Sequence, residues 1–112
     1  LKVRQPCAQA SFELHRVDRD ETLRRATVRL DGATRSIEVS WQTSLSLWRS
    51  KHKPFSQHCV TKLSTASALR LEIVISRRRR YRLQARSPLE RDLIAITFRA
   101  FLEEFPPSDC PP

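Results

Sequence analysis

Three cysteines and three histidines are the side chains best able to bind a metal or act as nucleophiles. Cys7, Cys59 and Cys110 are far apart, and only Cys59 has a neighbouring histidine, His58. Adjacent residues of a strand point to opposite faces, so this pair predicts no shared site. An odd number of widely spaced cysteines forms neither a disulfide framework nor a Cys-x-x-Cys pair. We expect a reducing compartment and no bound metal.

Catalytic patterns are also missing from the sequence. A glycine-rich phosphate loop needs several glycines, and the chain has one, Gly32. No Ser/His/acid set or pair of carboxylates stands out. His15, His52 and His58 fit ordinary surface or strand positions. We therefore expect a non-enzymatic protein that uses no cofactor.

Arginine is the residue type with the clearest pattern. The chain has 21 Lys and Arg against 12 Asp and Glu, a net charge of +9, and four arginines are adjacent at 77–80. Adjacent like charges repel, so such a run usually marks an interaction site or a tail. This run lies between two strand patterns and cannot be a tail. An anionic partner is therefore expected: an acidic membrane, a nucleic acid or an acidic protein.

Alternating apolar and polar residues predict strands that would position these arginines. The first strand covers 11–17, and a hairpin follows from 23–30 to 37–41. Asp31-Gly32 is a strong hairpin signal, and it predicts a positive φ at Gly32. Inward positions of this hairpin are Ala26, Val28, Leu30, Ile37, Val39 and Trp41.

The second half of the strand region is less regular. Residues 45–48 suggest a short strand, 51–54 a turn, and 59–63 another strand. A second hairpin is clearer, with Leu69, Leu71, Ile73 and Ile75 on one face. The four arginines form its turn, and Tyr81, Leu83 and Ala85 return along the same inner face.

The C-terminal segment changes to a helical period. Ser87 is a good N-cap, Pro88 suits the first turn, and Glu90 completes a Ser-x-x-Glu capping box. One apolar face consists of Ile94, Phe98, Phe101 and Phe105, and Pro106-Pro107 end the helix. A second apolar row consists of Leu89, Leu93, Ile96 and Ala100. A deeply buried helix is the slightly favoured interpretation of two rows, and a partner-binding face is the alternative.

Strands followed by one capped helix resemble the pleckstrin homology superfamily over residues 10–105. Leu23-Arg-Arg-Ala-Thr-Val-Arg-Leu-Asp-Gly32 resembles its second strand and turn, and Tyr81-Arg-Leu-Gln-Ala-Arg-Ser-Pro-Leu-Glu-Arg91 resembles its last strand and closing helix. The resemblance implies a mainly β, α+β fold: two packed antiparallel sheets of about seven strands, forming a barrel capped by one C-terminal helix. It implies one domain, 10–106, with flexible ends at 1–9 and 107–112. Ile94 stands where the family usually has tryptophan.

The resemblance also implies a lipid-facing end of the barrel, where some members hold inositol phosphates. The residues that would bind lipid or another anionic partner are Arg16, Arg24, Arg77, Arg78, Arg79, Arg80 and Arg82. Ala26 replaces the last arginine of the lipid-binding pattern, and the loop Asp18-Arg19-Asp20-Glu21 would repel phosphate. Weak, non-specific attraction to anionic lipid is therefore expected, rather than specific phosphoinositide recognition.

These observations favour a protein–protein scaffold at the cytoplasmic face of a membrane. Because the chain has no methionine, we expect an initiator methionine, and any acylated segment that anchors the protein, upstream of Leu1. Among divergent members, the chain resembles the inner-membrane-complex sub-compartment proteins of apicomplexan parasites, which implies that location. One alternative is a phosphoinositide-binding domain. The other is a nucleic-acid-binding domain, which the isoelectric point of about 10.7 fits and in which Trp48, Phe55 or Tyr81 would stack on bases.

Overall fold

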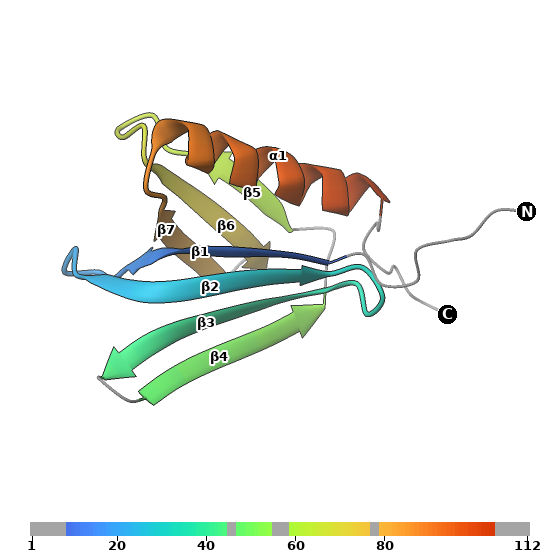
Figure 1. Cartoon of the computed structure of the whole chain (residues 1–112), viewed down its shortest axis with the longest axis horizontal. Coiled ribbons are helices and arrows are strands. Elements are labelled where there is room, and N and C mark those ends of the chain that lie inside the picture. The colour runs from blue at the N-terminus through green and yellow to red at the C-terminus, as the bar shows by residue number, and fades with distance from the viewer. Residues whose placement is uncertain (1–8, 45–46, 55–58, 77–78, 105–112) are drawn as a thin grey trace, which may run out of the picture.

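The computed structural model describes residues 9–44, 47–54, 59–76 and 79–104, and over these ranges the chain is mainly β (Figure 1). Seven strands precede one helix in the described part of the chain. They are β1 (Gln9–Val17), β2 (Leu23–Asp31), β3 (Ser36–Ser44), β4 (Leu47–Pro54), β5 (Val60–Leu63), β6 (Arg70–Ser76), β7 (Arg79–Gln84) and α1 (Pro88–Glu104).

All seven strands belong to one antiparallel sheet, in the order β4-β3-β2-β1-β7-β6-β5. The prediction of two packed sheets is therefore wrong. β1 joins the two groups of strands because it pairs with β2 along its whole length and with β7 near its C-terminal end, His15 opposite Gln84 and Arg16 opposite Leu83. From this junction β5, β6 and β7 cross the first four strands, and α1 lies over them (Figure 1).

The core lies between the two groups of strands and is closed on one side by α1. The inward positions predicted for the first hairpin are all buried, as are Leu71, Ile73 and Ile75 of β6 and Tyr81, Leu83 and Ala85 after it. These residues form one cluster with Ile94 and Phe98 of the helix. Leu69, predicted on the same inner face, is half-buried and precedes β6. Apart from Leu69, the inward residues that alternation predicted for the two hairpins are buried.

The β2–β3 hairpin differs from the predicted turn. Asp31 pairs with Ser36, so the loop holds four residues rather than the two of a tight Asp-Gly turn. The positive φ falls on Arg35, at 52°, and Gly32 is buried with no positive φ. The Asp31 carboxylate stabilises the loop by accepting a 2.9 Å hydrogen bond from the Ala33 N–H.

Two predicted turns contain strand residues. β4 runs through the turn predicted at 51–54, and Arg79 and Arg80 belong to β7 rather than to the arginine turn. Arg77, Arg78, Phe105 and Pro106-Pro107 lie outside the described residues. The ends 1–8 and 107–112 do so as well, and Gln9, predicted in the flexible end, begins β1.

The predicted cap begins α1. The Glu90 N–H donates to the Ser87 hydroxyl at 3.1 Å, and the Glu90 carboxylate accepts from the N–H of Arg86, rather than from that of Ser87, at 2.9 Å. Ile94 is 2% exposed and belongs to the core cluster. Arg91 fixes the helix to the β5–β6 connection by donating to the carbonyl oxygens of Ser64 (3.4 Å) and Ser67 (3.1 Å).

Candidate functional site

The loop between β1 and β2 is the centre of a cluster of ion pairs. Two backbone hydrogen bonds close it, from Asp18 N–H to the Thr22 carbonyl and from Glu21 N–H to the Asp18 carbonyl, both 2.9 Å. Glu21 has a φ of 68°, which few non-glycine residues adopt. This conformation directs two carboxylates to arginines of four strands. We call Arg16, Asp18, Glu21, Arg24, Arg70 and Arg82 the hairpin cluster.

Asp18 holds the two basic residues predicted to bind phosphate from β1 and β2. Arg24 donates from Nε to the Asp18 carboxylate, and Arg16 Nε lies 4.0 Å from the same group. Arg24 also donates to the Thr43 carbonyl of β3 at 3.2 Å. A guanidinium that already has a carboxylate partner has less to gain from an external phosphate.

Glu21 holds a second pair of arginines. Its carboxylate accepts from Arg70 at 2.8 Å and from Arg82 at 3.1 Å. These two hydrogen bonds, Arg70 first, lower the pKa of Glu21 below its ordinary value of 4.5. Arg82 also donates to the Asp18 carbonyl, so the loop is fixed to β6 and β7.

Arg16 has a structural environment of its own. Its guanidinium lies 4.3 Å from the centre of the Trp41 ring and 6.0 Å from that of Tyr81. This is cation–π geometry, in which the aromatic faces attract the charge. Burial raises the pKa of Tyr81, and the charges of Arg79 and Arg16 oppose that shift. Arg16 therefore covers the end of the core rather than projecting into solvent.

The structure thus brings together Arg16, Arg24 and Arg82, which were predicted to bind an anionic partner. It also places beside them Asp18 and Glu21, two acids of the loop that we expected to repel phosphate. The acids act as internal partners of the predicted lipid-binding arginines. Arg79 is half-buried and Arg80 exposed on β7, and neither has an ion pair among the described residues. Two carboxylates at the centre of the cluster weigh against a specific phosphate site.

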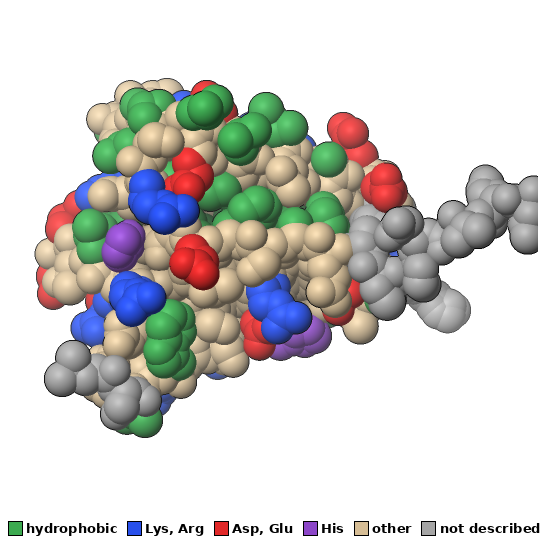
Figure 2. Space-filling view, viewed as in Figure 1, with side chains coloured by type: hydrophobic (Ala, Val, Ile, Leu, Met, Phe, Trp, Pro, Cys, Tyr) green, Lys and Arg blue, Asp and Glu red, His purple; other side chains and the backbone are tan. Residues whose placement is uncertain are grey.

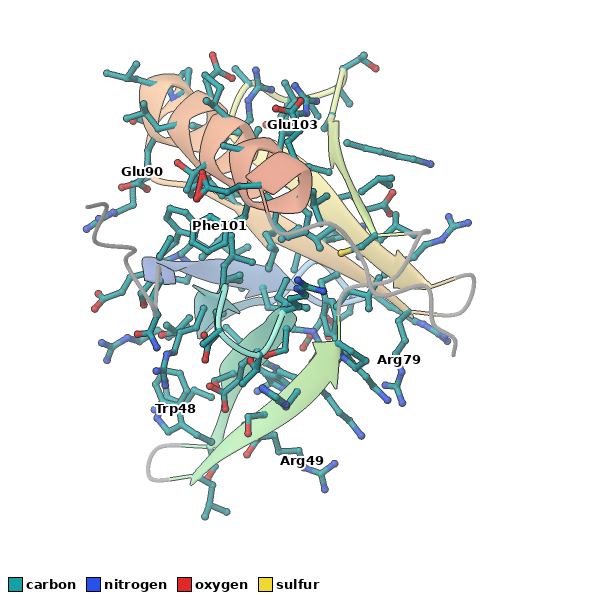
Figure 3. The ribbon with its side chains drawn as sticks, turned by 90° about the vertical axis from the view of Figure 1, so that its right-hand side faces the viewer. Trp48, Arg49, Arg79, Glu90, Phe101 and Glu103 are labelled. Atoms are coloured by element: carbon teal, nitrogen blue, oxygen red, sulfur yellow. The ribbon has the colours of Figure 1, made fainter. Side chains whose placement is uncertain are left out.

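A second basic surface, missed by sequence reasoning, lies on β4. Arg49, Lys51 and Lys53 alternate along one face of this strand and pair with Trp41, Val39 and Ile37 of β3. None has an ion pair within the described residues. In Figure 3, Arg49 is on β4, at the edge of the sheet. The i, i+2, i+4 spacing of Arg49, Lys51 and Lys53 was the sequence pattern from which this surface could have been predicted. We call these three residues the β4 basic row.

The second apolar row of α1 is exposed, so the slightly favoured interpretation of a deeply buried helix is wrong. Leu89 is 69% exposed, Leu93 53% and Ile96 61%, and Ala100 is exposed as well. Only Ile94, Ala95 and Phe98 of the helix are fully buried. Hydrophobic side chains gather on the outer side of α1 in Figure 2. We call Leu89, Leu93, Ile96 and Ala100 the outer row.

A surface hollow of about 410 Å³ lies on the outside of β1 and β2. Glu13, His15, Arg25, Trp48 and Arg86 are among its lining residues. It is open and mixed in charge, and charged side chains lie around it on the face seen in Figure 2. Trp48 is 46% exposed there, whereas Tyr81 is buried and cannot stack on a base. Phe55 lies outside the described residues.

Neither the search for metal sites nor the comparison with known proteins assigns a function to this chain. Among the described residues no three His, Cys, Asp or Glu side chains form a group that could hold a metal ion. No helix in the described ranges has the length and apolar character needed to cross a bilayer. Comparison with protein-family models gives no match, and comparison with curated proteins gives no significant one.

Proposed function

We propose that this chain is a non-catalytic, pleckstrin-homology-like interaction module that binds protein through the outer row of α1. The observation that supports this is the exposure of Leu89, Leu93 and Ile96, each more than half accessible to solvent. Single exposed apolar residues are common, but a continuous row of them on one helix marks an interaction surface.

The outer row lies outside the core cluster. At about 100° per residue, the row is roughly opposite Ile94 and Phe98, which pack into the core. Arg91 and Arg99 add hydrogen bonds from α1 to carbonyls around β5. The helix is therefore held by one face, and the opposite face is available to a partner.

We further propose that the module works at the cytoplasmic face of a membrane, with attachment supplied by a segment outside the given sequence. The β4 basic row supports weak attraction to anionic lipid because its charges lack acidic partners among the described residues. Stereospecific phosphoinositide binding is disfavoured because the arginines of the hairpin cluster form ion pairs with Asp18 and Glu21.

The direct test is proximity labelling in the cells that produce the protein, with Leu93→Asp plus Ile96→Asp compared against wild type. The matched control is Leu47→Asp plus Ser50→Asp, which adds the same charge to two exposed residues of β4, at the opposite end of the sheet from β5. We expect a set of labelled neighbours that is lost from the outer-row variant and retained in the control. Identical neighbour sets for all three forms, with unchanged thermal unfolding, would contradict the proposal.

A further inference from the structure

The spacing of the outer row is that of a helix-pairing seam. Leu89, Leu93, Ile96 and Ala100 are separated by four, three and four residues. When the interval between apolar residues alternates between three and four, these residues lie along one side of the helix and can pack between the side chains of a second helix. The row spans most of α1, which runs from Pro88 to Glu104. A partner helix with the same spacing, aligned with α1, is the occupant that this geometry fits.

Charges at the two ends of the seam favour one orientation. Arg86 precedes the seam by three residues and Glu103 follows it by three, and both are exposed, although Arg86 lies just before α1 and already pairs with Glu90 of its own chain at 2.9 Å. If a second α1 lay parallel to the first, Arg86 would face Arg86 and Glu103 would face Glu103. If it lay antiparallel, each arginine would face a glutamate. Like charges directly opposite destabilise a helix pair and opposite charges stabilise it.

The antiparallel arrangement also matches the residues at the centre and on the flank. Leu93 falls opposite Ile96 of the second copy, and Leu89 falls opposite its Ala100. Asp92 and Arg99 lie one heptad apart on the same flank of the helix, and Arg99 is exposed although it also donates to the Thr61 carbonyl at 3.5 Å. A two-fold axis through the middle of the seam therefore brings each Asp92 beside the other copy's Arg99. The side chain of Asp92 is 49% exposed, so its oxygens remain accessible although Arg91 contacts one of them.

We propose that the partner of the outer row is a second copy of this chain, with the two α1 helices antiparallel around a two-fold axis. This rests on the proposed function and names its partner. The interface is isologous: the same surface of each copy is used, and each contact occurs twice. One helix per copy buries less than a standard interface, so the dimer is reversible, with a dissociation constant on the order of micromolar.

Sedimentation velocity of the 112-residue chain across about 1 to 300 μM, a range set around that order of magnitude, tests the inference. We expect a concentration-dependent dimer that Leu93→Asp plus Ile96→Asp reduces to monomer, while Leu47→Asp plus Ser50→Asp leaves it intact. Circular dichroism and thermal unfolding establish that each variant is folded. A monomer over the whole range, or a dimer unaffected by the outer-row substitutions, overturns the inference.

A charge exchange tests the orientation and leaves the apolar seam unchanged. In the homodimer of Asp92→Arg, or of Arg99→Asp, residues 92 and 99 of the two copies carry the same charge at both symmetry-related contacts. Each substitution therefore weakens the homodimer at least tenfold, roughly 1.4 kcal/mol. Mixing the two variants restores association because both pairs are then opposite in sign. A parallel dimer shows no such rescue and overturns the proposed orientation.

Failure of this inference and failure of the proposed function give different results. If the chain is monomeric but its labelled neighbours still depend on Leu93 and Ile96, the second copy is the wrong partner and the outer row remains a binding surface. If the chain is monomeric and its labelled neighbours do not change, both proposals fail.

Discussion

Glu21 is the residue whose role could least be inferred from its neighbours in the sequence. Its two arginine partners are 49 and 61 positions further along the chain. Exposed ion pairs usually contribute little because solvent screens them and the side chains lose entropy. Glu21 differs from a simple pair because one carboxylate connects β6 and β7 to a loop whose own conformation has a positive φ.

The pH dependence of stability should therefore report on Glu21. Its pKa in the folded chain is lowered, so its contribution is complete above the ordinary value of 4.5 and is lost as the pH falls through the folded value. We expect Glu21→Gln to lower the free energy of unfolding at pH 7, and the difference from wild type to be smaller at an acidic pH well below 4.5. Urea titrations at both pH values measure it. Glu104→Gln, at an exposed site without an ion pair among the described residues, is the control.

Arg16 gives a prediction that separates a structural role from lipid binding. Because its guanidinium packs on Trp41 and lies beside Asp18, we expect Arg16→Ala to lower the free energy of unfolding by about 1 kcal/mol. Chemical denaturation followed by tryptophan fluorescence provides the measurement. Unchanged stability together with a large loss of lipid binding would instead assign Arg16 to a ligand site.

At the scale of the elements, the sequence predicted those strands that have one buried and one exposed face. β1, β2, β3, β6 and β7 alternate accordingly, and the inward residues predicted for β2, β3, β6 and β7 are buried, apart from Leu69, which is half-buried and precedes β6. β4 was divided into a short strand and a turn because, as an edge strand, it buries neither face and shows no apolar alternation. Basic residues are common on such edges, where they discourage pairing with another sheet.

The joining of two strand groups into one sheet was not predictable for a related reason. Only two residue pairs connect β1 to β7, and nothing in either strand's own pattern specifies its partner. The candidate site shows the same limit. The arginines could be named from the sequence, but their carboxylate partners depend on contacts between distant segments. The outer row was visible in the sequence, whereas its exposure depends on which face of α1 packs.

The cap of α1 is a local feature, so its contribution can be tested locally. Ser87 accepts a hydrogen bond from the Glu90 N–H, and removing such a cap typically costs about 1 kcal/mol. We expect Ser87→Ala to lower the free energy of unfolding by that amount, measured by urea denaturation. Ser11→Ala, at an exposed position of β1, should change it little. A variant at 87 as stable as wild type would mean that tertiary contacts alone hold the first turn.

At the scale of the whole molecule, the net charge is +9. Within the described ranges, some of the basic residues have acidic partners and others do not. Those of the hairpin cluster have acidic partners, and those of the β4 basic row have none among the described residues. Long-range attraction to an anionic surface depends on total charge, but close contact requires side chains that are not already paired. The β4 edge and Arg79 and Arg80 of β7, which also have no ion pair among the described residues, are therefore the parts of the molecule expected to lie nearest to anionic lipid.

Liposome co-sedimentation tests this orientation. Replacing Arg49, Lys51 and Lys53 by serine should reduce binding to phosphatidylserine vesicles by about 1 kcal/mol per residue near the surface. The control replaces Arg25, Arg29 and Arg35, which removes the same charge from other exposed positions. Equal losses from both variants would mean that only total charge matters. Tight binding to one phosphoinositide isomer that survives physiological salt and is lost in Arg24→Ser would contradict the predicted weak, isomer-blind attraction. In that case the ligand would have to displace Asp18 from the arginines.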